Sequence, residues 1–150
     1  MTLYPIEEVV PHRGNLLLLQ RVLRWDEDSI EAALVVPSEG LFCQHDGVPA
    51  WVGIEYMAQA IAAWAGCRAR RDGGTPKIGF LLGSRRYRSA VPVFPAGTAL
   101  VVHAHRELIG DNGLGMFACR IVAGDACWVE ANVSVFEPDD AQAYLESGSA

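Results

Sequence analysis

Residues 50–70 read AWVGIEYMAQAIAAWAGCRAR, and this stretch decides the fold. It has no internal proline and is rich in alanine, which favours a helix. Apolar residues lie all the way round this predicted helix rather than along one stripe, and a helix of that kind is buried. One sheet covers only part of such a helix. The sequence therefore predicts a helix enclosed by a curled sheet, with a dimer partner supplying the rest of the cover.

The flanking sequence predicts strands, because apolar and polar residues alternate between clusters of turn residues. The predicted strands are residues 16–25, 29–36, 77–89, 98–107, 114–123 and 126–136. Two precede the helix and four follow it, so strands and helices do not alternate as in a doubly wound sheet. The predicted fold class is α+β, with an antiparallel sheet of about six strands wrapped around one long central helix. A turn near residue 124 pairs Val122 with Cys127, which puts Cys119 and Cys127 on opposite faces.

Composition predicts one domain. The chain has 150 residues, of which 51% are hydrophobic, and we expect a single domain over 1–150 with an acidic tail at 137–150. No apolar run reaches the ~18 residues that span a membrane, and no secretory signal opens the chain, so we expect a soluble cytoplasmic protein. The four cysteines show no Cys-x-x-Cys pair and no zinc-type spacing. We therefore expect reduced thiols and no metal site.

The charge is distributed unevenly along the chain. The formal net charge is -6, yet residues 68–88 hold seven basic residues and one acid, which leaves -12 for the rest. The total disfavours a nucleic-acid binder, whereas the basic window suits one face that meets an acidic partner. A solvated basic face is the alternative interpretation.

Glu55 is an ionisable residue within the apolar helix, near its N-terminal end. Gln59 lies one turn further along, within hydrogen-bonding reach. Buried carboxyls are often functional, so Glu55 is a candidate catalytic residue. A structural carboxyl that caps or pairs with a neighbour is the alternative.

His45 lies ten residues earlier, in a loop with glycine and proline that leads into the helix. A neutral histidine as base and a carboxyl as acid suit proton abstraction next to a carbonyl. Free N–H groups at a helix N-terminus can stabilise the developing oxyanion. The sequence has no Gly-rich phosphate loop, Gly-x-Ser-x-Gly elbow or His-Glu-x-x-His helix, so nucleotide, serine-hydrolase and zinc-protease chemistry have no support.

Residues 41–60 resemble the active-site loop and helix of the (3R)-hydroxyacyl-ACP dehydratases of fatty acid synthesis. The matched features are a Phe-x-x-His that ends at His45, a proline turn at 49–50 and a helix of the Glu-Ala-Met-Ala-Gln type over 55–59. Residues 11–21 and the turn at 95–98 are similar to further segments of that family. The short loop after His45 is similar to a divergent branch found with aryl polyene biosynthesis, in which a partner dehydratase is also present.

The resemblance implies a hotdog fold and a homodimer, or a heterodimer with a second hotdog dehydratase, whose catalytic groups meet across the interface. His45 would remove the α proton of a 3-hydroxyacyl thioester, and Glu55 of the opposite subunit would protonate the departing hydroxyl. The backbone N–H of Ala50 would hold the thioester oxygen, and Gln59 would support Glu55.

The same resemblance implies that the substrate arrives on acyl carrier protein through its phosphopantetheine arm, with no cofactor, nucleic acid or membrane involved. Trp51, Tyr56 and Trp64 would line a tunnel for the acyl chain, although plain core aromatics are the alternative. The basic residues that would dock the acidic carrier protein are Lys77, Arg85, Arg86 and Arg88.

Two other functions are compatible with these residues. One is a hotdog acyl thioesterase, in which Glu55 activates water and His45 is incidental. The other is a non-catalytic or half-catalytic partner subunit of a heteromeric dehydratase.

Overall fold

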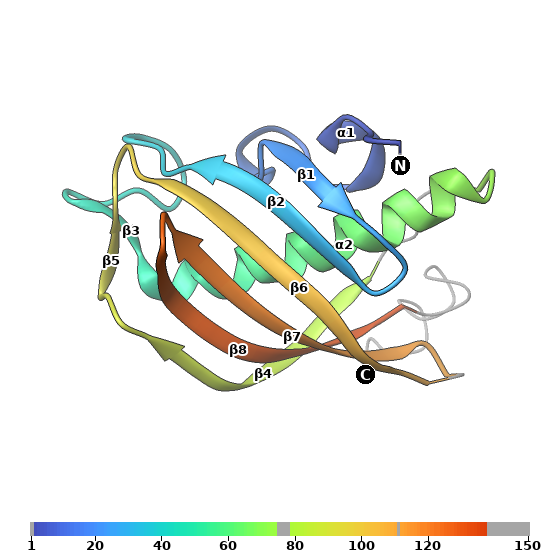
Figure 1. The fold of residues 1–150 in the computed structure, drawn as a ribbon. Coiled ribbons are helices and arrows are strands. Elements are labelled where there is room, and N and C mark those ends of the chain that lie inside the picture. The colour runs from blue at the N-terminus through green and yellow to red at the C-terminus, as the bar shows by residue number, and fades with distance from the viewer. Residues whose placement is uncertain (1, 75–78, 111, 138–150) are drawn as a thin grey trace, which may run out of the picture.

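One long helix, α2 (Gly53–Arg71), lies against a six-stranded antiparallel sheet that curls past it (Figure 1). The structure is a computed structural model and describes residues 2–74, 79–110 and 112–137. A short 3-10 turn, η2 (Ala50–Val52), leads into the helix, which packs on β2, β6, β7 and β8. The predicted α+β class, with one long helix and about six strands, is confirmed.

The sheet has the strand order β1-β2-β6-β7-β8-β4, so the strand that follows the helix lies at the far edge from β1. Its strands are β1 (Arg21–Trp25), β2 (Ser29–Val35), β4 (Phe80–Ser89), β6 (Ala99–Ile109), β7 (Leu114–Ala123) and β8 (Ala126–Phe136). The remaining elements are α1 (Ile6–Val9), the 3-10 turn η1 (Gly14–Leu16) and a pair of three-residue strands, β3 (Gly47–Pro49) and β5 (Val93–Pro95).

The structure corrects the predicted start of the first strand, and two other predicted segments extend beyond the described residues. The first strand begins at Arg21 rather than residue 16, because the chain before it forms η1 and is then held by the helix. The strand predicted over 77–89 is described from Phe80 onward, and Lys77 lies outside the described residues. The predicted acidic tail also lies outside them from residue 138 onward. The pairing of β3 with β5 was not predicted.

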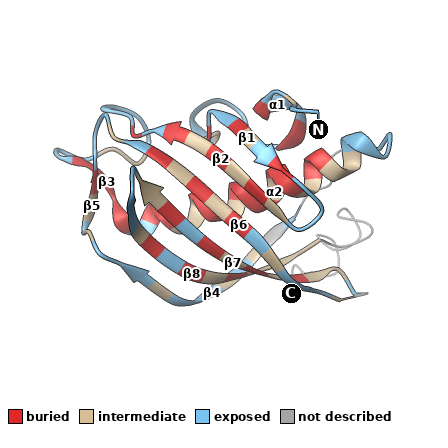
Figure 2. Cartoon of the chain, viewed as in Figure 1, coloured by how far each residue is buried: buried red, intermediate tan, exposed pale blue. Residues whose placement is uncertain are grey.

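Burial alternates along the central strands, so one face of the sheet packs on the helix and the other faces outward (Figure 2). On β6, Val102 and Ala104 are buried, whereas His103 between them is only partly buried. The predicted pairing of Val122 with Cys127 is confirmed, and Cys119 is buried while Cys127 is exposed.

The helix is covered on the side that faces the sheet and open on another. Met57, Ala60 and Ala63 are fully buried, as predicted. A stripe one turn apart along the other side is only partly buried, and its members are Glu55, Ala58, Ala62, Ala65 and Ala69. The six strands do not reach this side, which agrees with the expectation that one sheet covers only part of the helix. Cover of the open side by a dimer partner stays a prediction. Within the described ranges, no helix is long and apolar enough to cross a membrane.

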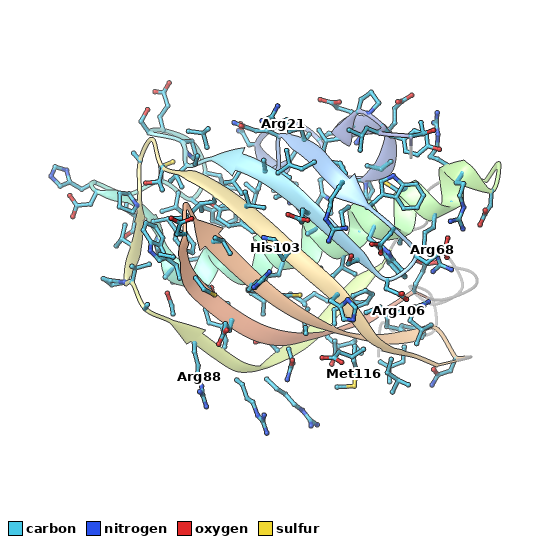
Figure 3. The ribbon with its side chains drawn as sticks, viewed as in Figure 1. Arg21, Arg68, Arg88, His103, Arg106 and Met116 are labelled. Atoms are coloured by element: carbon cyan, nitrogen blue, oxygen red, sulfur yellow. The ribbon has the colours of Figure 1, made fainter. Side chains whose placement is uncertain are left out.

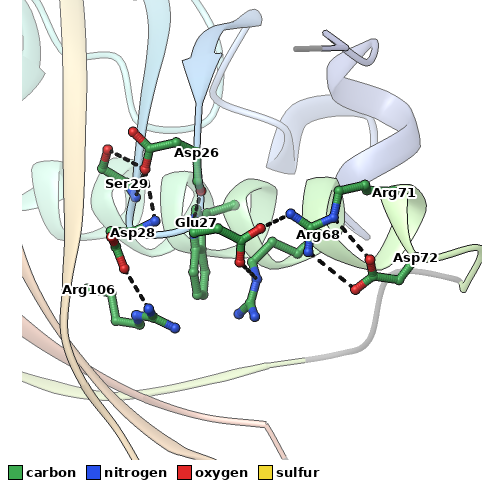
Figure 4. Close-up of polar contacts among 9 residues, drawn as sticks. Asp26, Glu27, Asp28, Ser29, Arg68, Arg71, Asp72 and Arg106 are labelled. Carbon is green, nitrogen blue, oxygen red and sulfur yellow. Dashed lines mark hydrogen bonds and ion pairs between the residues drawn. The ribbon is translucent and has the colours of Figure 1, made fainter.

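The turn between β1 and β2 is tied to the C-terminal end of the helix by a network of charges (Figure 4). Arg68 and Arg71 both form ion pairs with Glu27, at 3.6 Å for Arg68 Nε. Arg70 pairs with Glu8 at 3.3 Å, and Arg106 of β6 pairs with Asp28 at 2.5 Å. The arginines at the helix end are thus neutralised within the chain, so the basic window at 68–88 is not one continuous patch.

Candidate functional site

A cavity of about 570 Å³, here named the helix groove, runs along the open side of α2. Its lining includes the partly buried stripe of the helix, from Glu55 to Ala69, together with Leu81 and Phe117 from the sheet. At ~1.5 Å rise per residue, that stripe is about 20 Å long. The groove therefore offers a long apolar surface with a carboxyl at one end, which suits a linear apolar chain that carries a polar head.

Glu55 lies in the first turn of α2 and is partly buried in the groove. Among the described residues, its carboxyl forms no hydrogen bond or ion pair. A carboxyl that faces an apolar cavity without a committed partner is available to a ligand, because nothing has to be displaced before it donates or accepts a proton.

His12 lines the same end of the groove, and the sequence analysis did not identify it as a functional residue. Burial lowers the pKa of His12 from its ordinary value, the Glu55 carboxylate opposes that shift, and Arg13 adds to it. The imidazole is therefore mainly neutral at neutral pH. The only sequence signal was its place in the Pro-His-Arg segment that resembles the dehydratase family.

Gln59 is almost fully buried, at 1% exposure, and its amide is committed to the entry segment. Its Oε1 accepts hydrogen bonds from the N–H groups of Leu18 at 2.9 Å and Leu19 at 3.4 Å. Its Nε2 donates to the carbonyl of Leu16 at 2.6 Å. The prediction that Gln59 supports Glu55 is corrected to this extent: both ends of the amide bind backbone groups of residues 16–19 and not the carboxyl.

Ala50 does not offer the free N–H that was predicted for an oxyanion. Its N–H donates to the carbonyl of Pro92 at 3.0 Å, and its carbonyl accepts a hydrogen bond from the Tyr87 hydroxyl. Ala50 is buried, so both backbone groups need partners, and β4 and the segment after it supply them. The predicted role of Ala50 is therefore wrong for this structure.

His45 projects into solvent from the loop before β3, with its side chain 99% exposed and 3.9 Å from the Asp46 carboxylate. It does not line the helix groove. One chain therefore does not bring His45 and Glu55 into the same cavity. The expectation that they meet across a dimer stays a prediction.

Of the three aromatic residues predicted to line a tunnel, only Trp64 lines the groove. Its indole N–H donates to the carbonyl of Asp26 at 3.0 Å, which fixes the ring. Tyr56 is a core residue, 2% exposed against Phe94, and burial raises its pKa to about 12. Trp51 is 61% exposed. The tunnel prediction is therefore corrected for Tyr56 and Trp51 within the single chain.

The arginines of β4 lie on the outer face of the sheet rather than at the groove. Arg86 and Arg88 line a second hollow of about 590 Å³, together with Arg120 of β7, and Arg85 is exposed beside them. Arg88 projects away from the sheet in Figure 3. The cluster does not lie beside Glu55, because of the described β4 residues only Leu81, near the start of the strand, lines the groove.

These four arginines form no ion pair or hydrogen bond with any residue that the structure describes. They differ in this respect from the arginines at the end of α2, which have acidic partners. No three His, Cys, Asp or Glu side chains in the described part of the chain are grouped so as to hold a metal ion.

Comparisons with known proteins point to one family. A profile of the ApeP-like family, described as ApeP dehydratase, matches residues 4–146. The 3-hydroxyacyl-[acyl-carrier-protein] dehydratases FabZ of two Thermus thermophilus strains are 34% identical over 134 residues, which is 83% of this chain and 89% of theirs.

Solved structures agree with that match. A chain of the dehydratase heterocomplex ApeI:P from Xenorhabdus doucetiae superposes with a TM-score of 0.89 at 26% identity, covering 98% of this chain and 99% of that one. A hypothetical thioesterase with coenzyme A from Streptococcus pneumoniae shares the fold alone, with a TM-score of 0.61 at 8% identity over 78% of this chain and 84% of that one.

Proposed function

The chain belongs to the ApeP-like dehydratase family, and we propose that it converts a (3R)-3-hydroxyacyl thioester on acyl carrier protein to the trans-2-enoyl thioester. The observation that carries this proposal is the helix groove, which joins an apolar wall to an uncommitted carboxyl at one end. The acyl chain would lie along the alanine stripe, and its 3-hydroxyl would meet Glu55.

The reaction is an elimination of water. A histidine base takes the proton from the carbon next to the thioester carbonyl, and the new carbon–carbon double bond forms as the bond from C3 to oxygen breaks. Glu55 gives its proton to the departing hydroxyl, which leaves as water, and the proton on the histidine restores Glu55 afterwards. The charges balance without an oxidant, a reductant or a metal.

The histidine base would come from a second hotdog subunit. His45 is fully exposed in its own chain, and it does not line the groove that holds Glu55. The His45 of each subunit would therefore act together with the Glu55 of the other. The open side of α2 and the edge strand β4, on which Leu82 is 53% exposed, are the surfaces left for such a partner. The ApeI:P heterocomplex favours a different dehydratase as partner, in aryl-polyene-type synthesis, over a second copy.

The proposed carrier-protein dock is the arginine cluster of β4. An acidic partner needs cations that are not already neutralised, and Arg85, Arg86 and Arg88 meet that condition while the arginines of α2 do not. Guanidinium groups also suit the phosphate of the phosphopantetheine arm.

Charge reversal tests this dock. We expect Arg86→Glu with Arg88→Glu to raise the KM for a carrier-bound substrate about ten-fold or more and to leave the KM for a small thioester unchanged. Arg21→Glu is the matched control, because Arg21 is also exposed but lies at the opposite edge of the sheet (Figure 3). If the double variant and the Arg21→Glu control changed the KM for each substrate equally, the dock would lie elsewhere.

The dehydration itself is tested with a 3-hydroxyacyl carrier protein, offered to the chain alone and to the chain mixed with a sister hotdog dehydratase. We expect the mixture to form enoyl product faster than the sister alone. Absence of any gain from this chain would contradict catalysis, and release of free thiol without enoyl product would indicate a thioesterase.

A subunit that completes the complex without supplying catalytic groups is the second candidate. The observation that favours it is the occupied N–H of Ala50, which leaves the expected oxyanion donor engaged with Pro92. The two candidates differ in whether the side chains of His45 and Glu55 matter.

A further inference from the structure

The end of the helix groove holds an imidazole that the proposed reaction does not use. His12 lines the groove beside Glu55, and its Nδ1 is buried without a hydrogen-bond partner among the described residues. The Glu55 carboxyl is uncommitted as well. Buried polar atoms in native proteins are seldom left unpaired, so the buried Nδ1 of His12, in one cavity with a carboxyl that has no partner, requires an explanation.

The segment that carries His12 is anchored on both sides. On one side, the Arg13 guanidinium donates to the carbonyls of Val10 and Glu7, each at 2.6 Å. On the other, Gln59 of the helix binds the backbone of residues 16–19. Because Gln59 lies one turn after Glu55 on the same helix, this anchor also fixes the entry segment relative to the carboxyl.

The charges around His12 are few and come from two elements. Glu55 faces it from α2, and Arg13 lies beside it on its own segment. The other charged groups among the described residues that line the groove are Arg68 and Asp72, at the opposite end of the helix, and Glu137, which follows β8. A neutral imidazole has one donor and one acceptor nitrogen, so it can pair with a carboxyl whether that carboxyl is protonated or ionised.

We propose that His12 is a positioning residue for Glu55, and that the two side chains of one subunit act as a carboxyl–imidazole pair at the end of the groove. The pair holds the carboxyl in place while it donates a proton and takes one back, since the imidazole can exchange the roles of donor and acceptor. This inference rests on the proposed function only in taking Glu55 as the working acid.

The first test requires no turnover. The imidazole of His12 is titrated by NMR in the wild type, in Glu55→Gln and in the control Glu39→Gln, and His12→Asn assigns its signal. Removal of a nearby carboxylate should lower the pKa of His12 by about half a unit or more, because the charge that favours imidazolium is lost. Glu39 is exposed, and its change should leave the titration as it was. An unchanged His12 pKa in Glu55→Gln overturns the inference, whatever the activity of the protein.

The second test uses turnover and a conservative replacement. In the complex with the sister dehydratase, His12→Ala should lower kcat about ten-fold and leave KM within two-fold. His12→Asn, whose amide nitrogen lies near the position of Nδ1, should recover most of that loss. An unchanged kcat in His12→Ala, or equal damage in the two variants, contradicts a positioning role.

Discussion

Gln59 shows how a single buried side chain positions the site without touching a substrate. Its amide forms three hydrogen bonds to the backbone of residues 16–19, and the same segment leads back to His12. The carboxyl of Glu55 and the imidazole of His12 therefore share one scaffold. Loss of the amide would disturb both.

We expect Gln59→Leu to destabilise the protein by about 2–3 kcal/mol, because it removes three hydrogen bonds of a buried amide and leaves two backbone donors and one acceptor without this partner. Chemical denaturation followed by circular dichroism measures the change. Gln20→Leu is the control, since Gln20 is exposed and its Oε1 accepts one hydrogen bond from Val35 at 3.2 Å. Equal, small effects of the two substitutions would mean that Gln59 does not hold the entry segment.

Glu55 and His45 are candidates from the sequence alone because of their setting: a carboxyl in an apolar helix and a histidine in a loop before it. The contacts of Ala50 could not be predicted from the sequence, since its N–H donates to the carbonyl of Pro92, a residue far along the chain. Gln59 was predicted from helical spacing alone, which identifies neighbours on the helix but not the segment that packs over it.

At the level of elements, α2 packs closely against α1. A Cβ built on Gly66 would lie 2.0 Å from the carbonyl oxygen of Val9, so the two backbones are in direct contact there. We expect Gly66→Ala to cost about 2–4 kcal/mol of unfolding free energy, because backbone must move to admit the methyl group.

Gly74→Ala is the matched control for that substitution. A Cβ at Gly74 would meet the carbonyl of Ala69 at 3.5 Å, an ordinary van der Waals contact. Its effect should stay within about 0.5 kcal/mol. A Gly66→Ala protein as stable as Gly74→Ala would show that α1 does not pack where the structure places it.

The turn between β1 and β2 predicts a pH dependence of stability. The Asp26 carboxylate accepts hydrogen bonds from the N–H groups of Asp28 and Ser29, both at 2.8 Å, and the first of these contributes most to holding its pKa below the ordinary value. A carboxyl with a lowered folded pKa stabilises the protein above its unfolded pKa of ~3.9, and this contribution is lost as the pH falls through the folded value.

Asp26→Ala should therefore reduce stability at neutral pH, and its difference from the wild type should shrink as the pH is lowered toward about 3. Denaturation curves across that range measure the difference in unfolding free energy between the two proteins. A difference that is independent of pH would mean that the Asp26 charge does not stabilise the fold.

The long elements were predictable from the sequence and the short ones were not. The helix is confirmed to within a few residues because Pro49 and the Asp72-Gly73-Gly74 sequence bound it. The strands β3 and β5 have three residues each, too few for alternation to show, and they form only by pairing with one another. The η1 turn was missed because tertiary hydrogen bonds to Gln59 decide its conformation.

At the level of the whole molecule, the basic residues of the 68–88 window fall into two groups. Those at the end of α2 pair with acids of the chain's own body, and those on β4 have no partner among the described residues. Only the second group is available to an acidic protein. Because the proposed contact with the carrier protein would be electrostatic, the KM for a carrier-bound substrate should rise with ionic strength, whereas the KM for a small thioester should not. Steady-state kinetics at low and high salt would check this, and equal salt dependence for the two substrates would contradict it.

The open side of α2 and the solvent-exposed His45 both point to a missing subunit. Under the proposed function, a chain that has its carboxyl in a groove and its histidine in water would be complete only with a second subunit. His45 and Glu55 are then the two groups through which this chain would take part in catalysis.

The most direct test is the turnover of a 3-hydroxyacyl carrier protein by the sister dehydratase mixed with the His45→Ala, Glu55→Gln double variant of this chain. We expect enoyl formation to fall to the level of the sister alone, while the Glu39→Gln control keeps the wild-type rate. The double variant should still form the complex, as measured by size-exclusion chromatography. If the double variant supports the same rate as the wild type, the side chains of His45 and Glu55 take no part in catalysis and this chain acts as a scaffold.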